Sequence, residues 1–85
     1  MSETREIRIK RLKMRSMRRG IKEMDLILQA YAAGRLEAMT PAELDLYEAL
    51  LDENDQDLYQ WVTGQVQPPA ALAGLIHEIS MTFQG

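Results

Sequence analysis

The chain has 85 residues, enough for one hydrophobic core, so we expect a single domain over residues 1–85. It contains no cysteine, which excludes disulfides and thiolate metal sites. No apolar stretch approaches the roughly 20 residues of a membrane-spanning helix. We therefore expect no direct membrane insertion and a cytoplasmic location.

The net charge of −3 conceals a strong asymmetry between the two parts of the chain. Residues 1–22 carry nine of the ten Lys and Arg residues and two acids, a net charge of +7. Residues 23–85 carry one Arg and eleven acids, a net charge of −10. The basic end has the charge to meet nucleic acid, an acidic membrane surface or an acidic protein surface.

Helical spacing of apolar residues recurs along the chain, and no segment shows the alternation of a half-buried strand. Residues 4–17 are rich in good helix formers, with Thr4 as a plausible N-cap. A second amphipathic helix starts near Ile21, and Gly34 is expected to end it in a left-handed conformation. These patterns predict an all-α fold.

Three further helices follow, so the sequence predicts a compact bundle of about five short helices. The stretch Thr40-Pro41-Ala42-Glu43 matches a capping box with proline at the first helical position. Residues 52–55 can cap a short fourth helix, which Gly64 closes. The last helix presents Leu72, Leu75, Ile76, Ile79 and Phe83 on one side. We expect residues 1–3 and 84–85 to be frayed.

Catalytic and metal-binding constellations are not predicted. His77 is the one histidine, which excludes a histidine-based triad and a multi-histidine metal site. Acid pairs such as Asp45 and Glu48, or Asp55 and Asp57, fit a solvent-facing helix surface or capping segment better than general acid–base catalysis. No glycine-rich phosphate-binding motif occurs. We therefore predict that the chain is not an enzyme.

The basic segment has three interpretations. A charge-rich face packed beside acidic helices is the simplest, and contact with an acidic protein surface comes next. A nucleic-acid-binding module is the alternative from another class, but the acidic remainder of the chain would repel phosphates and no aromatic residues interleave with the cations. Met14 and Met17 are the methionines expected to be exposed, and Trp61 is expected in the core rather than in an interface.

The stretch R-S-M-R-R-G-I-K-E-M-D, residues 15–25, is predicted to join the first two helices. Gly20 would be C′ of the first helix and N-cap of the second, which makes Glu23 its N3 residue. Arg18 and Arg19 then lie at the positive end of a helix dipole, which is unfavourable by about 0.3–1 kcal/mol each. Such local conflicts are found at functional sites.

This stretch resembles the signature of the SdhE family of succinate dehydrogenase assembly factors. The pattern R-S-x-R-R-G-x-x-E-x-D-L-x-L is carried by Arg15, Ser16, Arg18, Arg19, Gly20, Glu23, Asp25, Leu26 and Leu28. Two later blocks of the sequence also resemble family patterns. The pattern L-x-x-Y/F-x-x-L-L-D/E matches Leu44, Tyr47, Leu50, Leu51 and Asp52, and the pattern D-L-x-x-W-x-x-G matches Asp57, Leu58, Trp61 and Gly64. Two residues depart from the family pattern: Gln56 stands where the family often has Pro, and Tyr31 stands where it often has Phe.

The resemblance implies a small helical assembly chaperone that promotes covalent attachment of FAD to the flavoprotein subunit of succinate dehydrogenase, and in some bacteria of fumarate reductase. It implies no stably bound cofactor, because the FAD is carried by the partner. Carried over by position, Arg19, Gly20 and Glu23 are the expected contact residues, with Arg18 and Asp25 beside them. A transient partner surface favours a monomer. We expect no nucleic-acid partner.

Overall fold

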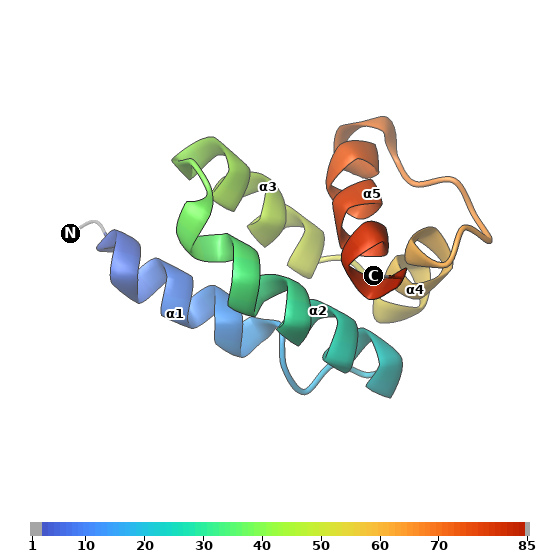
Figure 1. Ribbon diagram of the computed structural model, residues 1–85, viewed down its shortest axis with the longest axis horizontal. Helices are drawn as coiled ribbons and strands as arrows, with labels where there is room; N and C mark the ends of the chain where they lie inside the picture. The colour runs from blue at the N-terminus through green and yellow to red at the C-terminus, as the bar shows by residue number, and fades with distance from the viewer. Residues whose placement is uncertain (1–2, 85) are drawn as a thin grey trace.

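A computed structural model describes residues 3–84 of the chain. Within these residues there are five α-helices, one short 3₁₀-helix and no strand (Figure 1). The elements in chain order are α1 (Arg5–Arg15), α2 (Lys22–Arg35), η1 (Leu36–Ala38), α3 (Pro41–Leu51), α4 (Asp55–Val62) and α5 (Ala70–Gln84). The predicted all-α fold is confirmed.

Helix α2 is the centre of the bundle. It contacts α1 on one side and α4 and α5 on the other, and α3 also packs on α5. In Figure 1, α1 and α2 run antiparallel beside one another, and α4 and α5 gather at one end of the molecule. No helix in the described part of the chain is both long enough and apolar enough to cross a membrane.

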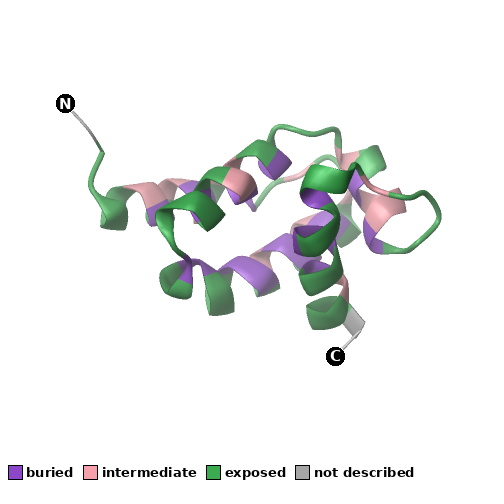
Figure 2. Cartoon of the chain, turned by 90° about the horizontal axis from the view of Figure 1, so that it is seen from above, coloured by how far each residue is buried: buried purple, intermediate pink, exposed green. Residues whose placement is uncertain are grey.

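The core forms where the apolar stripes of these helices meet. Figure 2 shows the buried residues on the faces that the helices turn toward one another. Tyr31 of α2 and Tyr47 of α3 are the largest fully buried side chains, with ring centroids 5.7 Å apart. Burial of an aromatic side chain contributes more apolar area than most other residue types, so these two rings are central to stability.

Several predicted helix ends are confirmed. The Thr4 hydroxyl accepts from the amide of Ile7, and Thr40 and Glu43 form a complete capping box with Pro41 in the first turn. Gly64 has φ +81°. It ends α4 in a Schellman motif, in which its own amide donates to the carbonyl of Trp61 and the next amide reaches back one residue further.

The end of α2 differs from the prediction. Gly34 lies inside the last turn of α2 without a positive φ, and the chain continues through Arg35 into η1. Leu36 explains the difference, because it is fully buried and the 3₁₀ turn carries it into the core. The prediction that Gly34 stops the helix is therefore wrong.

Two apolar residues are more exposed than their helical spacing indicates. Phe83 lies near the end of α5 and is 52% exposed, although it was expected on the apolar side. Trp61 is half-buried and packs against the edge of the core. Of the expected frayed residues, Glu3 pairs with Arg11 and Gln84 is the last residue of α5, whereas residues 1, 2 and 85 lie outside the described part.

Candidate functional site

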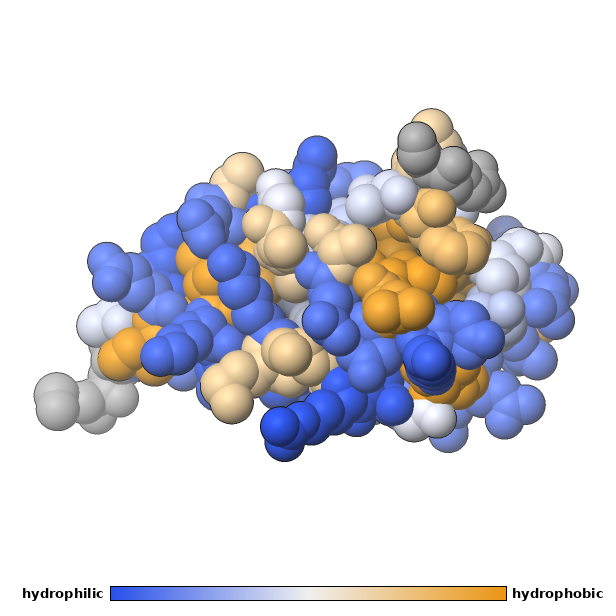
Figure 3. All heavy atoms as spheres, turned by 60° about the horizontal axis from the view of Figure 1, so that its bottom comes forward, coloured by the Kyte–Doolittle hydropathy of each residue, from blue (hydrophilic) through white to orange (hydrophobic). Residues whose placement is uncertain are grey.

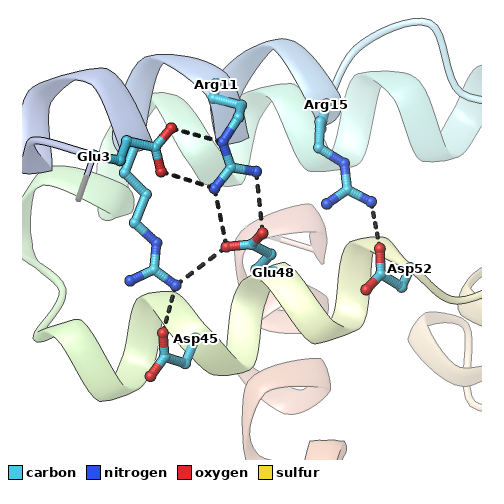
Figure 4. A network of polar contacts seen from close by, with 7 residues as sticks. Glu3, Arg11, Arg15, Asp45, Glu48 and Asp52 are labelled. Carbon is cyan, nitrogen blue, oxygen red and sulfur yellow. Dashed lines mark hydrogen bonds and ion pairs between the residues drawn. The ribbon is translucent and has the colours of Figure 1, made fainter. Parts of the chain in front are cut away.

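The basic face of α1 is neutralised by the acidic face of α3. Figure 4 shows Arg11 bound to Glu48 and Glu3, and Arg15 bound to Asp52. The Nη1 atom of Arg11 lies 3.0 Å from a Glu48 carboxylate oxygen, and Arg15 lies 2.6 Å from Asp52. Arg8 donates to Asp45 and Glu48 in the same network. The interpretation of a charge-rich face packed beside acidic residues is confirmed.

The network makes stability depend on pH. The hydrogen bond from Arg11 lowers the pKa of Glu48, with a second contribution from Arg8, so folding favours the ionised carboxyl. The ionised Glu48 carboxylate therefore stabilises the fold above its unfolded pKa near 4.5. This stabilisation is lost as the pH falls through the lower pKa of the folded state.

We therefore expect the free energy of unfolding to fall as the pH is lowered from 5 to 3, and Glu48→Gln to weaken that dependence by up to about 1 kcal/mol. Urea unfolding at several pH values measures this. Glu53→Gln is the control, because the Glu53 carboxylate has no ion-pair partner among the described residues, and it should leave the pH profile unchanged. Equal pH profiles for Glu48→Gln and the wild type would contradict the assignment.

Few cations remain for a nucleic-acid backbone. Lys13 pairs with Glu37, and the only described Lys or Arg side chains without an ion pair or hydrogen bond are Lys10, Arg18 and Lys22. Because phosphate binding depends on several uncompensated cations, this geometry weighs against the nucleic-acid alternative. Met14 and Met17 are 65% and 43% exposed, which confirms their predicted position.

Residues 16–21, which we call the corner, connect α1 to α2. Ser16 is the C-cap of α1 and Ile21 is the N-cap of α2. Gly20 is therefore neither the C′ residue of α1 nor the N-cap of α2, and Glu23 is the second helical residue rather than the third. The predictions for these positions are wrong because Ile21 packs against the core and so fixes where α2 begins.

The left-handed residue of the corner is an arginine. Arg18 has φ +58°, whereas Gly20 has no positive φ. This conformation is unfavourable for a residue with a side chain, by roughly 1–2 kcal/mol. A residue in such a conformation persists when its surroundings fix the backbone on both sides, and such residues cluster at functional sites.

On one side, a buried hydroxyl pair fixes the start of the corner. Ser16 is fully buried, its Oγ donates to the carbonyl of Leu12, and it lies 2.6 Å from the Tyr47 hydroxyl. Burial raises the pKa of Tyr47 to about 12, so the phenol keeps its proton at neutral pH and can donate to Ser16. Both hydroxyls are thereby satisfied within the core.

On the other side, the largely buried side chain of Arg19 donates hydrogen bonds to α1, α3 and α4. Its Nε donates to Asp55 at 2.6 Å, and its Nη1 donates to the carbonyl of Arg15 at the end of α1. Its Nη2 donates to the carbonyls of Leu51 and Glu53, at and just beyond the end of α3. The Arg19 side chain is only 11% exposed. Its guanidinium therefore supplies donors to carbonyls at helix ends, which lack partners within their own helices.

Gly20 also binds Asp55, the acid that binds Arg19. Its amide donates to the second carboxylate oxygen of Asp55 at 2.6 Å. A Cβ atom at Gly20 would lie 3.2 Å from that oxygen, so any side chain requires a local shift. Gly20 itself is exposed and has no positive φ, so the constraint on its side chain comes from the close approach of Asp55 rather than from a turn conformation.

The five predicted site residues lie in and next to the corner but differ in how far they are buried. Arg18, Gly20 and Glu23 are exposed, and Asp25 is half-buried and accepts from Gln29. Arg19 points inward. The sequence does not predict the part that Asp55 plays. Asp55 is 35 residues from Gly20, and instead of facing solvent its side chain is only 18% exposed and binds Arg19 and Gly20. The only signal for it in the sequence is its position in the acidic segment 52–55.

A shallow apolar hollow of about 210 Å³ adjoins the exposed residues. It is lined by Glu23, Leu26, Ile27, Ala30, Thr82 and Phe83, of which Leu26 is 61% exposed. Figure 3 shows that hydrophobic groups on the side carrying α1 and α2 gather in patches separated by hydrophilic side chains. The described residues contain no group of three or more His, Cys, Asp or Glu placed to hold a metal ion.

Comparison with known families decides the assignment. Residues 10–82 match the model of a family described as the flavinator of succinate dehydrogenase. The chain belongs to this flavinator family. The resemblance seen in the sequence is confirmed, and the matched range includes the whole corner and both later blocks.

Curated relatives of the flavinator family carry the name succinate dehydrogenase assembly factor 2, mitochondrial. The chain is 51% identical to the Scheffersomyces stipitis protein over 61 residues, which are 72% of this chain and 41% of that protein. It is 46% identical to the Meyerozyma guilliermondii protein over 61 residues (72% and 45%), and 42% identical to the Mycosarcoma maydis protein over 72 residues (85% and 30%). The chain thus spans less than half the length of these relatives.

Two predictions can be compared with these names. The expectation of a non-enzymatic role agrees with a family of assembly factors. The cytoplasmic location is contradicted, because the relatives are mitochondrial proteins. That prediction is wrong because it rested on the lack of cysteine and of a membrane span, and neither feature distinguishes one aqueous compartment from another.

Proposed function

We propose that the chain promotes covalent attachment of FAD to the flavoprotein subunit of succinate dehydrogenase, or of fumarate reductase, by docking through the corner. Arg18, Gly20 and Glu23 form the contact surface, with Asp25 beside them and Arg19 supporting it from beneath. The observation that carries the proposal is an exposed, strained corner anchored on both sides, in a member of the flavinator family.

The charges of the corner support a docking role. Arg18, Lys22 and Glu23 are exposed and have no ion-pair partner within residues 3–84, although most other cations of the basic segment are paired. Because the backbone of the corner is already fixed, binding a partner would order only the side chains of these residues and not the chain that carries them. The surface is therefore suited to specific contact with complementary charges on another protein.

In this proposal the chain aligns the reacting groups of the flavoprotein and takes no part in the chemistry itself. It binds the flavoprotein and favours a conformation in which two groups of that partner, the histidine that accepts the flavin and the bound flavin itself, are aligned for reaction. Good alignment of two reacting groups can accelerate a reaction by many orders of magnitude without a catalytic side chain from the assisting protein. The chain itself binds no cofactor stably and acts as a monomer.

The test is co-expression with a flavoprotein subunit that lacks covalent FAD. Flavin fluorescence that survives denaturing electrophoresis measures covalent attachment, and the expected result is a strong fluorescent band only when this chain is present. Equal bands with and without the chain would refute the proposal. A salt-sensitive shift of duplex DNA or RNA near physiological salt would instead favour the nucleic-acid alternative.

Arg18→Gly separates charge from conformation at the corner. Glycine adopts the left-handed conformation freely, so we expect the free energy of unfolding to stay within about 1 kcal/mol of wild type. Loss of a charged contact should lower the rate of flavinylation by roughly tenfold. Lys10→Ala is the matched control, because it removes another unpaired cation, on α1, and should leave the rate unchanged. A wild-type rate for Arg18→Gly would remove Arg18 from the contact surface.

A further inference from the structure

We infer that Asp55 is the positioning residue of the corner: it holds Arg19 and Gly20 in the conformation that presents Arg18 and Gly20 to the partner. This inference rests on the proposed function for its consequence but not for its geometry. Asp55 lies outside the R-G-x-x-E segment, in a different part of the sequence and at the start of a different helix.

The two oxygens of Asp55 bind two consecutive residues of the corner. Oδ1 accepts from Nε of Arg19 and Oδ2 accepts from the backbone amide of Gly20, both at 2.6 Å. A carboxylate that accepts one bond on each oxygen fixes its two partners relative to one another. The peptide between Arg19 and Gly20 is therefore held against α4.

Asp55 is itself held in place. It is the first residue of α4, directly after the N-cap Asn54, whose side chain accepts from the amide of Gln56. Leu58 and Val62 anchor the same helix in the core. A carboxylate in the first turn is also favoured by the helix dipole. A binding surface supported by such a rigid element keeps its geometry before the partner arrives.

Asp55 acts on the contact surface indirectly, through its hydrogen bonds to Arg19 and Gly20. Its side chain is 18% exposed, and both oxygens are occupied by the corner. Arg18 stands between Ser16, which is fixed by Tyr47, and Arg19, which is fixed by Asp55. These two anchors fix the backbone on both sides of the left-handed Arg18, which is the condition under which such a conformation persists.

The chain offers a matched control in Asp52. Asp52 binds Arg15 at 2.6 Å in a comparable acid–arginine pair, yet its side chain is 67% exposed and it binds nothing in the corner. Replacing either acid by asparagine removes one negative charge and one ion pair with little change in volume. Only Asp55→Asn affects the corner: asparagine has a single, uncharged acceptor oxygen, so the Nε of Arg19 and the amide of Gly20 can no longer both keep a carboxylate acceptor.

The experiment measures flavinylation rate and hydrogen exchange of the Gly20 amide in the wild-type chain, Asp55→Asn, Asp55→Glu and Asp52→Asn. For Asp55→Asn we expect helical content near wild type, at least tenfold faster exchange at Gly20 and a roughly tenfold lower rate of flavinylation. Asp52→Asn should match wild type in both measurements. Asp55→Glu keeps the charge but has a longer side chain, and its rate should follow its Gly20 protection.

A folded Asp55 variant that loses Gly20 protection and keeps the wild-type rate would overturn the inference, as would Asp55→Asn with both wild-type Gly20 protection and a wild-type rate. If Asp55→Asn unfolds, the same comparison is made with Asp55→Glu. If the wild-type chain does not stimulate flavinylation, the proposed function fails. In that case Gly20 exchange still decides whether Asp55 fixes the corner, so the two failures are distinguishable.

Discussion

Gly20→Arg is expected to leave helical content nearly intact and to abolish flavinylation of the partner. The new side chain would start 3.2 Å from the Asp55 carboxylate, so the corner must shift by a few tenths of an ångström and the guanidinium must project outward. The loss of stability should be modest, about 1–2 kcal/mol, because Gly20 is exposed and outside every helix. The loss of function should be complete, because a side chain at this position separates the two docking surfaces.

The matched control is Gly34→Arg. Gly34 lies in the last turn of α2 without a positive φ, and a Cβ atom there would meet nothing within 4 Å. It lies roughly 18 Å along α2 from the first residue of that helix. The same substitution should therefore stabilise the helix there by up to about 1 kcal/mol and leave flavinylation unchanged. Circular dichroism and covalent flavin fluorescence measure both variants, and an unfolded Gly20→Arg would mean that the corner is purely structural.

Arg19→Ala is expected to cause the largest loss of stability, about 2–4 kcal/mol. It removes one of the two partners of the half-buried Asp55 carboxylate and the donors that reach the ends of α1 and α3. For a domain of this size such a loss lowers the melting temperature by more than roughly 10 °C. Flavinylation should fall as well, even at temperatures where the variant is folded, because the corner loses one of its anchors.

Arg15→Ala is the comparison for this variant. Arg15 also forms an ion pair with an acid of the second half of the chain, but its side chain is 34% exposed and its guanidinium pairs only with Asp52 among the described residues. An exposed pair of this kind contributes about 1 kcal/mol or less. Urea unfolding of both variants measures the difference. Similar losses for Arg15→Ala and Arg19→Ala would show that Arg19 does not join the helix ends as its geometry indicates.

The fold could be read from the sequence to a large extent, because its determinants are local. Helical spacing and the capping residues Thr4, Thr40 and Glu43 act within a few residues of themselves, so their effects do not depend on the rest of the molecule. Gly64 behaves as predicted for the same reason. Gly34 does not, because burial of Leu36, a tertiary effect, outweighs the local preference.

The candidate site could be read only in part. Its five predicted residues lie within one short stretch of the sequence, and the sequence by itself determined that the chain belongs to the flavinator family. It did not predict that Asp55 meets them. The tertiary structure decided their orientation: Arg19 points inward, Arg18 takes the left-handed conformation, and Asp55 lies close against Gly20. The physical reason is that these properties depend on contacts between residues more than 30 positions apart, which no local pattern contains.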